Sequence, residues 1–529
     1  MLRTFHLLGL GSLVATALLC LLSPWWALLF LVLVPAYLIG LRDSLQTKHA
    51  ILRNFPLLGQ LRYFFEAIRP EIRQYFIESN TDGRPIPRER RSVIYQRAKG
   101  ELETLPFGTQ KDVYEPGYEW IGHSMAARAP HHGEERVPIG GRECKQVYAA
   151  SVLNVSAMSY GSLSAPAVRA LNLGAKAGDF WHNTGEGGIS DHHLLGGDLC
   201  WQIGTGYFGA RGKDGGFDAG AYRENAQRPE VQLIELKLSQ GAKPGHGGIL
   251  PKGKITPEIA RIRGVGFDSD VLSPPRHSAF SSPAELMEFV SQLRELSGGK
   301  PVGIKFCVGQ PEDVVALCKA MLETEQLPDF IAVDGGEGGT GAAPLEFSNA
   351  VGAPLFDGLN LVQNALVGFG LRDRLRLVAS GGTMTGFDLA TRLAAGADLV
   401  QSARAFMLTL GCIQARKCHS NDCPTGVATQ LPHLTRGLVV EDKAQRVERW
   451  HAETIEALYE LLGAAGLSVP SQLRPHHIHR RISQTKVRSY AEIYEYLSPS
   501  QLLSEEAPGP WREWLARAGA DRFYEGVPS

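Results

Sequence analysis

Short apolar runs alternate with helical patterns along most of this chain, from about Val147 onward. The runs are Val152–Met158, Phe180–Thr184, Leu233–Leu238, Val302–Val308, Phe330–Val333, Leu375–Ala379 and Leu399–Gln401. Strands that alternate with helices form parallel sheets, and a stretch of roughly 280 residues suits a closed (β/α)8 barrel. We therefore predict an α/β fold in which residues 145–430 form a (β/α)8 TIM barrel.

Glycine-rich sequences follow several of these predicted strands. The 59 glycines of the chain gather in short runs and do not form low-complexity linkers. The loops concerned are Met158-Ser159-Tyr160-Gly161-Ser162, Asn183-Thr184-Gly185-Glu186-Gly187-Gly188, Ser239-Gln240-Gly241-Ala242-Lys243, Asp334-Gly335-Gly336 and Ser380-Gly381-Gly382. Loops that follow barrel strands meet at the C-terminal face, where ligands bind. We expect a ligand site there.

The last two strands carry a candidate phosphate site. Gly381 and Gly382 follow the run Leu375–Ala379, and Ala403 and Arg404 follow the run Leu399–Gln401. Backbone N–H groups in these two loops form a phosphate site in many barrels, and an arginine adds a bidentate contact. A Gly-Gly pair alone is more often a simple turn, so the prediction depends on its position in the barrel.

Three of the eight cysteines form a tight group with C-x5-C-x4-C spacing, Cys412, Cys418 and Cys423, followed by Pro424. Scattered cysteines with one such group are unlike a disulfide framework. Three thiolates fit a [3Fe–4S] cluster, or a four-iron cluster with a ligand from elsewhere. Zinc with His419 as a fourth ligand, or buried cysteines without a function, are the alternatives on spacing alone.

Two cations lie close together in the sequence and could hold a dicarboxylate. They are Lys243 and Arg263, and Gln240 could add a neutral donor; solvated surface charge is the alternative. Lys305 lies inside the apolar run Val302–Val308, and a buried lysine needs a partner. An FMN ring, which gains negative charge on reduction, is one such partner.

The chain begins with an apolar stretch, Phe5–Leu41, interrupted by Ser23-Pro24. Each half has about 17 residues and spans roughly 26 Å as a helix, so two short membrane spans or one kinked span are compatible. Basic residues precede and follow the stretch, which places the downstream chain in the cytoplasm. They are Arg3, Arg42, Lys48 and Arg53. A cleaved signal peptide is the alternative.

The remaining segments are polar. Residues 1–42 are expected to form the transmembrane part, residues 43–144 a polar helical collar with a helix that Pro70 opens, and residues 431–529 a C-terminal helical extension that includes a helix over Glu441–Leu462. The formal net charge of −1 gives no support for a nucleic-acid partner.

Taken in order, the motifs resemble the FMN-binding synthase domain of glutamate synthases over residues 145–470. They are MSYGSLS from Met158, NTGEGG from Asn183, KLSQGAKPGHGG from Lys237, PEIARIRG from Pro257, SPPRH from Ser273, GGTGAAP from Gly338, ASGG from Ala379 and CIQARKCHSNDCPTGVATQ from Cys412. The resemblance is greatest to the single-domain, membrane-anchored members of that family.

The resemblance implies a chemistry. Reduced FMN delivers a hydride to 2-iminoglutarate formed from 2-oxoglutarate and ammonia. The resemblance also implies that Gln240, Lys243 and Arg263 bind 2-oxoglutarate. It implies that Glu186, at the ammonia entrance, and Lys305 are catalytic residues. The FMN residues implied are Met158, Ser159, Lys305, Gly335, Gly336, Gly381, Gly382, Ala403 and Arg404; Cys412, Cys418 and Cys423 would ligate a [3Fe–4S] cluster.

The sequence also departs from the family. It has a membrane segment in place of a glutaminase domain, so we expect ammonia to come free or from a separate glutaminase partner. It has no dinucleotide fingerprint, so the electron donor, a ferredoxin or a reductase subunit, is not identified. Ala403-Arg404 replaces Gly-Thr, and His246 replaces an acidic residue. The alternatives are an oxidoreductase acting on another oxo or imino acid, and a membrane-bound electron-transfer protein.

Overall fold

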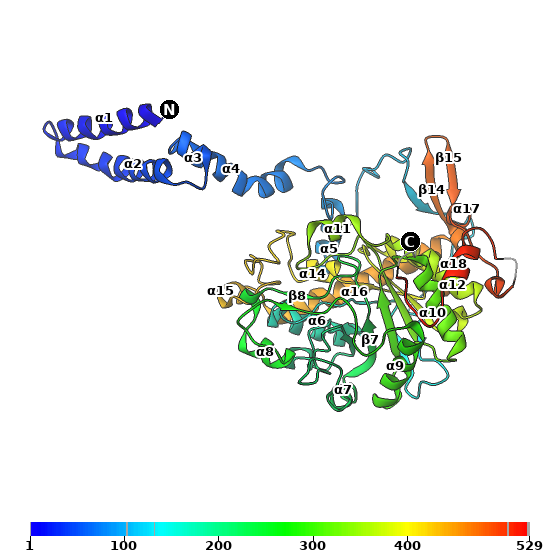
Figure 1. Ribbon diagram of the computed structural model, residues 1–529. Coiled ribbons are helices and arrows are strands. Elements are labelled where there is room, and N and C mark those ends of the chain that lie inside the picture. The colour runs from blue at the N-terminus through cyan, green and yellow to red at the C-terminus, as the bar shows by residue number, and fades with distance from the viewer. Residues whose placement is uncertain (1, 102–103, 132, 505–506, 526–529) are drawn as a thin grey trace. The chain divides into compact units, whose positions relative to one another are not determined.

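The computed structural model describes residues 2–101, 104–131, 133–504 and 507–525 (Figure 1). The chain divides into two compact units, Met1–Arg88 and Glu89–Ser529. The first unit contains the helices α1 (Leu2–Cys20), α2 (Phe30–Leu45), α3 (Ala50–Asn54) and α4 (Leu58–Ile72), with the 3-10 turn η1 (Pro24–Leu29) between α1 and α2 and the π turn η2 (Arg73–Ile77) after α4.

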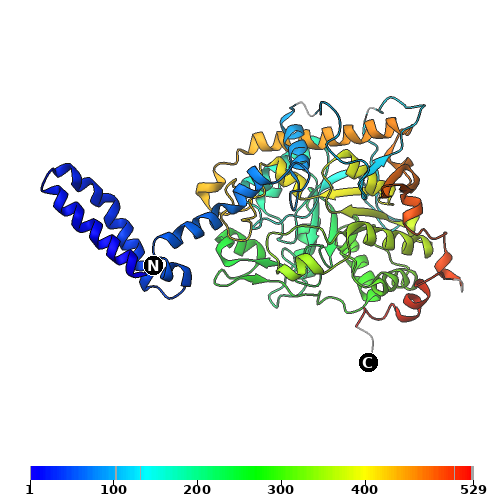
Figure 2. The ribbon, with the colours of Figure 1, turned by 90° about the horizontal axis from the view of Figure 1, so that it is seen from above.

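Helices α1 and α2 lie side by side as a hairpin (Figure 2). The ring of Tyr37 stacks on that of Phe5 at 5.4 Å, and its hydroxyl lies 3.2 Å from Nδ1 of His6. Two segments, Leu2–Cys20 and Pro24–Leu45, are long and apolar enough to cross a membrane, a test that a signal sequence near the N-terminus also passes.

The expected helix start at Pro70 is wrong. Pro70 lies inside α4, which continues to Ile72 before the π turn η2. The apolar pattern that begins at Leu58 runs through the proline to Ile72, and this amphipathic pattern outweighs the lost N–H donor.

The second unit is built around a closed barrel of eight strands, and every neighbouring pair in it is parallel. The strands are β4 (Leu153–Val155), β5 (His182–Asn183), β6 (Leu199–Ile203), β7 (Val231–Lys237), β10 (Val302–Phe306), β11 (Phe330–Asp334), β12 (Arg376–Ser380) and β13 (Leu399–Ser402). Strand β13 closes the barrel against β4, with Val400 opposite Leu153. The predicted (β/α)8 barrel is confirmed, and β6 is the strand that the sequence analysis did not identify.

The amino-terminal end of the barrel is closed by a hairpin of β2 (Val137–Ile139) and β3 (Tyr148–Ala150). Ile139 packs in a fully buried cluster with Trp181 and Phe330. The barrel interior above this cluster is polar, because the buried Glu235 carboxylate accepts hydrogen bonds from the amides of Asn183, Gln202 and Gln401. The hairpin and this cluster close the amino-terminal end of the barrel, so a ligand can enter only at the opposite, carboxyl-terminal end, where the loops lie.

Helices surround the barrel (Figure 1). They are α6 (Ala165–Gly178), α7 (Ala219–Ala226), α8 (Pro257–Arg263), α9 (Pro283–Leu296), α10 (Pro311–Glu323), α11 (Leu345–Ala350), α12 (Leu355–Gly368), α13 (Gly386–Ala394) and α14 (Arg404–Thr409). The long helix α16 (Val440–Ala464), close to the predicted Glu441–Leu462, packs on α6, where a Cβ at Gly174 would lie 2.4 Å from Val447. Glycine is therefore needed at this crossing.

Segments on both sides of the barrel in sequence pack onto the same unit. Helix α5 (Arg88–Lys99) precedes the barrel, and α15 (Pro432–Thr435), α17 (Tyr490–Ile493) and α18 (Trp511–Arg517) follow it. The C-terminal segment is not purely helical, because β14 (Ile478–Ser483) and β15 (Lys486–Ser489) form a sheet with β1 (Glu119–Ile121). A shorter pair, β8 (Ile249–Leu250) and β9 (Val271–Leu272), lies between β7 and β10.

Candidate active site

The glycine loops meet at the carboxyl-terminal face of the barrel. The backbone N–H of Gly241 donates to Oδ2 of Asp334 at 2.8 Å, and that of Gly335 donates to the carbonyl of Ser380 at 2.9 Å. A Cβ at Gly241 would lie 1.7 Å from the carbonyl oxygen of Gly335, and a Cβ at Gly185 would lie 2.5 Å from the amide of Ser159. The close approach of these loops therefore requires glycine.

Glu186 is the centre of an ionic cluster in this face. Nζ of Lys237 lies 2.7 Å from Oε1 of Glu186 and donates to Oε1 of Gln240 at 2.5 Å. Burial disfavours the charged carboxylate, but Lys237, with help from Lys243 and Arg263, holds the pKa of Glu186 below its usual value. Glu186 is therefore ionised at neutral pH. Lys237 was not among the predicted site residues.

Lys243 and Arg263 lie near Glu186 and are both buried. Nζ of Lys243 donates to the carbonyl of Ala342 at 3.3 Å, and burial with repulsion from Lys237 lowers the pKa of Lys243 to about 8, against the opposite effect of Glu186. Among the described residues, neither Lys243 nor Arg263 has a carboxylate within ion-pair distance. Three cations therefore share one carboxylate.

Arg263, at the end of α8, is placed by its surroundings. Its Nη2 donates to the carbonyl of Tyr160 at 3.0 Å, and its guanidinium lies over the ring of Phe208, 5.1 Å from the centroid. Its Nε is buried and has no hydrogen-bond partner among the described residues. Burial lowers the pKa of Arg263 to about 10, although Glu186 opposes the shift. An unpaired donor on a buried cation indicates that an acceptor is missing.

Lys305 on β10 lies inside the barrel. Its Nζ is 3.4 Å from Oγ of Ser156 and 3.6 Å from Oδ1 of Asp334. Burial opposes the charge, but the carboxylates of Asp334 and Glu235 raise the pKa of Lys305 above its usual value. Lys305 is therefore a fixed positive charge beneath the glycine loops.

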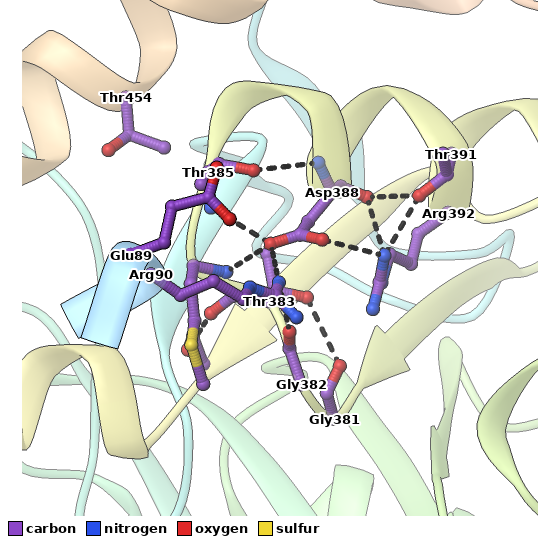
Figure 3. A network of polar contacts seen from close by, with 12 residues as sticks. Glu89, Arg90, Gly381, Gly382, Thr383, Thr385, Asp388, Thr391, Arg392 and Thr454 are labelled. Atoms are coloured by element: carbon purple, nitrogen blue, oxygen red, sulfur yellow. Dashed lines mark hydrogen bonds and ion pairs between the residues drawn. The ribbon is translucent and has the colours of Figure 1, made fainter. Parts of the chain in front are cut away.

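The loop after β12 forms the second part of the site (Figure 3). Gly381 and Gly382 have φ angles of 143° and 60°, and a Cβ on either would meet nothing closer than 3.5 Å. The loop leads into α13, where Oδ2 of Asp388 accepts from the amides of Met384 at 2.8 Å and Thr385 at 3.0 Å. The loop backbone is therefore held in place, and its positive φ angles favour glycine.

Arg90 contacts this loop, and Arg404 contacts the preceding loop, which follows β11. Arg90 of α5 donates to the carbonyl of Gly382 at 3.0 Å and pairs with Asp388 (Figure 3). Arg404 follows Ala403 at the start of α14 and donates to the carbonyl of Glu337 at 2.7 Å. Burial lowers the pKa of Arg404, and the charge of Arg90 adds to this effect. Arg90 was not predicted, because 292 residues separate it from Gly382.

Met158 and Ser159 follow β4 in the first loop, and Gly336 follows Gly335 after β11. Met158 is buried, and Oγ of Ser159 donates to Oγ of Ser162 at 3.1 Å. The structure thus places the predicted FMN and substrate residues in loops, at strand ends and, for Arg263 and Arg404, at helix ends.

Cys412, Cys418 and Cys423 lie in the loop between α14 and α15. Gln414, Arg416 and Asn421 in this loop have positive φ angles of 58°, 55° and 66°. In the described part of the chain, no three His, Cys, Asp or Glu side chains are arranged to hold a single metal ion.

Hydrogen bonds tie the cysteine loop to its surroundings. The Gln430 side chain donates to the carbonyls of Gly161 at 3.1 Å and Leu163 at 2.8 Å, next to the loop after β4. The Tyr95 hydroxyl of α5 donates to the carbonyl of Cys412 at 2.7 Å. The cysteine loop and the first glycine loop are therefore adjacent.

Lys254 lies between these two loops. It is buried, its Nζ donates to the carbonyl of Ser162 at 2.9 Å, and no carboxylate among the described residues pairs with it. Burial lowers the pKa of Lys254 to about 8, and the thiolate forms of Cys418 and Cys423 oppose that shift. Sequence reasoning missed Lys254 although it lies just before the motif PEIARIRG.

Comparison with known proteins adds the following. Residues 124–468 match a family described as the conserved region in glutamate synthase. The glutamate synthase large subunit-like protein YerD of Bacillus subtilis (strain 168) is 37% identical over 482 residues, which cover 83% of this chain and 91% of that protein. The archaeal glutamate synthase (NADPH) of Methanocaldococcus jannaschii is 34% identical over 328 residues, and the match spans 60% of each protein. Among solved structures, a protein described as a lactate oxidase of Pediococcus acidilactici matches with a TM-score of 0.42 at 14% identity, covering 78% of this chain and 92% of that one.

Proposed function

This chain belongs to the family that shares the conserved region of glutamate synthase, and on that premise we propose that it catalyses FMN-dependent reductive amination of 2-oxoglutarate. The observation that carries the proposal is the excess of buried positive charge around Glu186. Lys237, Lys243 and Arg263 share this one carboxylate at the mouth of the barrel. A dianionic substrate supplies the missing negative charge.

The proposed 2-oxoglutarate site consists of Gln240, Lys243 and Arg263. The unpaired Nε of Arg263 is a donor for one carboxylate, and the Lys243 ammonium is a donor for the other. Lys237 donates to both Glu186 and Gln240. It therefore fixes the residue proposed for ammonia relative to a residue proposed for 2-oxoglutarate. We assign Lys237 a positioning role.

The residues at the barrel mouth fit FMN. Lys305 supplies a buried positive charge for the isoalloxazine ring, and the Gly381-Gly382 turn after β12, with Arg404, suits a phosphate. Oε1 of Gln401 is buried and has no partner among the described residues, so it is an acceptor for a ligand donor. When bound, reduced FMN supplies the hydride.

The chain's own part in the reaction is binding, orientation and proton transfer. Lys243 and Arg263 orient the substrate so that its carbonyl carbon faces the flavin side of the site. Ammonia adds to this carbon, water leaves, and the imine carbon then accepts a hydride and its nitrogen a proton to give the amine of glutamate. The ionised Glu186 accepts a proton from ammonium as it enters.

We further propose that Cys412, Cys418 and Cys423 hold a [3Fe–4S] cluster. A cluster carries its thiolates on separate irons, unlike a single zinc ion, which gathers all its ligands at about 2.0–2.3 Å. Lys254 supports the proposal, because a buried ammonium without a carboxylate needs another anion, and thiolates bound to iron supply it. The hydrogen bonds of Gln430 place this loop beside the first glycine loop.

The cluster proposal is tested by metal analysis of anaerobically purified protein. We expect iron, and we expect Cys418→Ser to lose it. Cys144→Ser is the matched control, because Cys144 is also a free, partly exposed thiol but lies outside the C-x5-C-x4-C group. Zinc in place of iron, or iron retained in Cys418→Ser, would contradict the proposal.

We propose that α1 and α2 anchor the protein in the inner membrane with the barrel in the cytoplasm, as the basic residues after α2 favour. Electrons then come from a ferredoxin or a reductase subunit, and ammonia comes free or from a separate glutaminase. The membrane helices together with the cysteine loop also suit a second candidate, a membrane-bound electron-transfer protein without amino-acid chemistry.

One experiment separates the two candidates. Protein with reduced flavin is mixed anaerobically with pairs of oxo acids and amines, and flavin reoxidation is followed by absorbance. We expect reoxidation with 2-oxoglutarate and ammonium together, and not with either alone. Reoxidation by an artificial acceptor with no response to any oxo acid would favour electron transfer. Reoxidation by a different oxo acid would retain the reaction type and change the substrate.

A further inference from the structure

Helix α4, in the first unit, exposes a continuous apolar face. Leu58, Leu61, Phe65, Ile68 and Ile72 recur at intervals of three and four residues, so they lie on one side of the helix. The exposed fractions of Leu58, Leu61 and Phe65 are 56%, 55% and 58%, and Phe64 at 56% widens the face. An isolated helix of 15 residues is marginal in water unless such a face is covered.

Arginines lie along one edge of this face. Arg62, Arg69 and Arg73 are exposed and lie next to the apolar side of the helix. Arg62 pairs with Glu66 at 2.7 Å and Arg73 with Glu78 at 3.4 Å, and these ion pairs are at the surface. Phe65, Ile72 and Ile77 line a pocket whose charged residues are Arg69, Arg73, Glu78 and Asp82. From Gln46 to Glu78 the chain has five basic residues and three acidic ones. Long basic side chains beside an apolar helix face are typical of helices that lie on anionic membranes.

The start of α4 is tied to the end of α2. Asp43, which is 2% exposed, accepts a hydrogen bond from the amide of Leu57 at 3.2 Å and from the Gln60 side chain at 2.7 Å. Because α2 is one of the two apolar helices, these hydrogen bonds hold the first turn of α4 next to the end of the apolar segment. If α2 spans a membrane, α4 therefore begins at the membrane interface.

A second copy of this chain is the other candidate for covering the face. The apolar spacing matches one side of a coiled coil, but the face is wider than a coiled-coil seam because of Phe64. Pro70 and the π turn η2 also interrupt a regular helix pair. A lipid surface can cover this wide, irregular face, because lipids, unlike a second helix, need no regular spacing of side chains.

We propose that α4 lies in the headgroup region of an anionic membrane, with Leu58, Leu61, Phe65 and Ile68 toward the acyl chains and the arginines toward the phosphates; this rests on the proposed anchoring by α1 and α2. Photocrosslinking of the full-length protein in nanodiscs that contain phosphatidylglycerol tests it. Benzoylphenylalanine is placed at Phe65, at Tyr63 on the polar side of α4, and at Leu31 on α2.

The expected result is lipid adducts at Leu31 and Phe65, with several-fold less at Tyr63. Exchange of phosphatidylglycerol for phosphatidylcholine should reduce the adduct at Phe65 several-fold and leave that at Leu31 unchanged. Adducts at Leu31 but chain-to-chain crosslinks at Phe65 would overturn the proposal in favour of a second copy. Equal adducts at Phe65 and Tyr63 would also overturn it. No lipid adduct at Leu31 would show that the anchoring itself is wrong, and the proposal would fail with it.

Discussion

At the scale of single residues, the site is defined by charge that the protein leaves uncompensated. Lys243 and Arg263 are buried beside Glu186, and the glycines around them hold the loops close. Burying unpaired cations costs stability, and an anionic ligand that pairs with them would offset this cost. The substrate proposal can therefore be tested by removing one cation at a time.

Arg263→Ala should raise the 2-oxoglutarate concentration needed for flavin reoxidation. A charge-assisted hydrogen bond contributes about 1.5–3 kcal/mol, which corresponds to roughly tenfold to a hundredfold weaker binding. Arg261→Ala is the matched control, because Arg261 is on the same helix and exposed. FMN content should be unchanged in both. Full 2-oxoglutarate affinity in both Arg263→Ala and Lys243→Ala would remove the basis for this substrate.

The pKa of Lys243 predicts a pH dependence. Its pKa of about 8 in the free protein means that the ammonium form, which binds a carboxylate, is lost as the pH rises above 8. The affinity for 2-oxoglutarate should therefore be constant below pH 7 and fall by up to about tenfold per pH unit above pH 8. Lys243→Arg should bind without this fall, because a guanidinium stays charged. The measurement is the dissociation constant from spectral titration at pH 6–9.5; an equal fall in both proteins would assign it to another group.

At the scale of elements, the sequence analysis predicted what local patterns encode. Seven of the strands are short apolar runs, and the barrel follows from them. Strand β6 (Leu199–Ile203) was missed because Gln202 interrupts its short apolar run. The Gln202 side chain donates to Glu235 inside the barrel. The hairpin of β14 and β15 was missed because Arg480 and Arg481 give it no apolar pattern.

Contacts between distant elements could not be predicted from one sequence. Lys237 was within a recognised motif, but its bond to Glu186 depends on two different strands. Arg90 had no signal at all, because a basic residue in a polar helix is usually solvated and its partner is distant in the chain. The contacts of such residues can be recognised only in the folded structure, where distant parts of the chain meet.

Helix α5 should support the proposed phosphate end of the FMN site through Arg90. Arg90→Ala removes the hydrogen bond to Gly382 and the ion pair with Asp388, which fix the loop after β12. We expect the dissociation constant of FMN for the apoprotein to rise about tenfold or more, as for loss of a charged hydrogen bond. Fluorescence titration of FMN measures this. Arg88→Ala, an exposed change in the same helix, is the control. Equal FMN affinity in the two variants would show that Arg90 is structural only.

At the scale of the whole molecule, the two units differ in composition and in the roles that we propose for them. The first consists of apolar and amphipathic helices, and the second contains the barrel with both candidate cofactor sites. The segments before and after the barrel in sequence complete the second unit, since β1 pairs with β14 and α5 contacts the cysteine loop. The catalytic unit should therefore need its own N-terminal and C-terminal segments but not α1 and α2.

The anchoring proposal predicts where each part of the chain is found. Arg42 lies in the last turn of α2, and Lys48 and Arg53 follow that helix, so a two-span hairpin puts the barrel in the cytoplasm and the turn at Ser23 on the far side. Full-length protein should sediment with membranes, and protein that starts at Asp43 should leave them at high salt and still bind FMN. A protease site inserted after Ser23 should be cut from outside in sealed cells while the barrel stays intact. Cleavage of the barrel from outside would reverse the topology, and a mature N-terminus beyond Cys20 would identify a signal peptide in place of the first span.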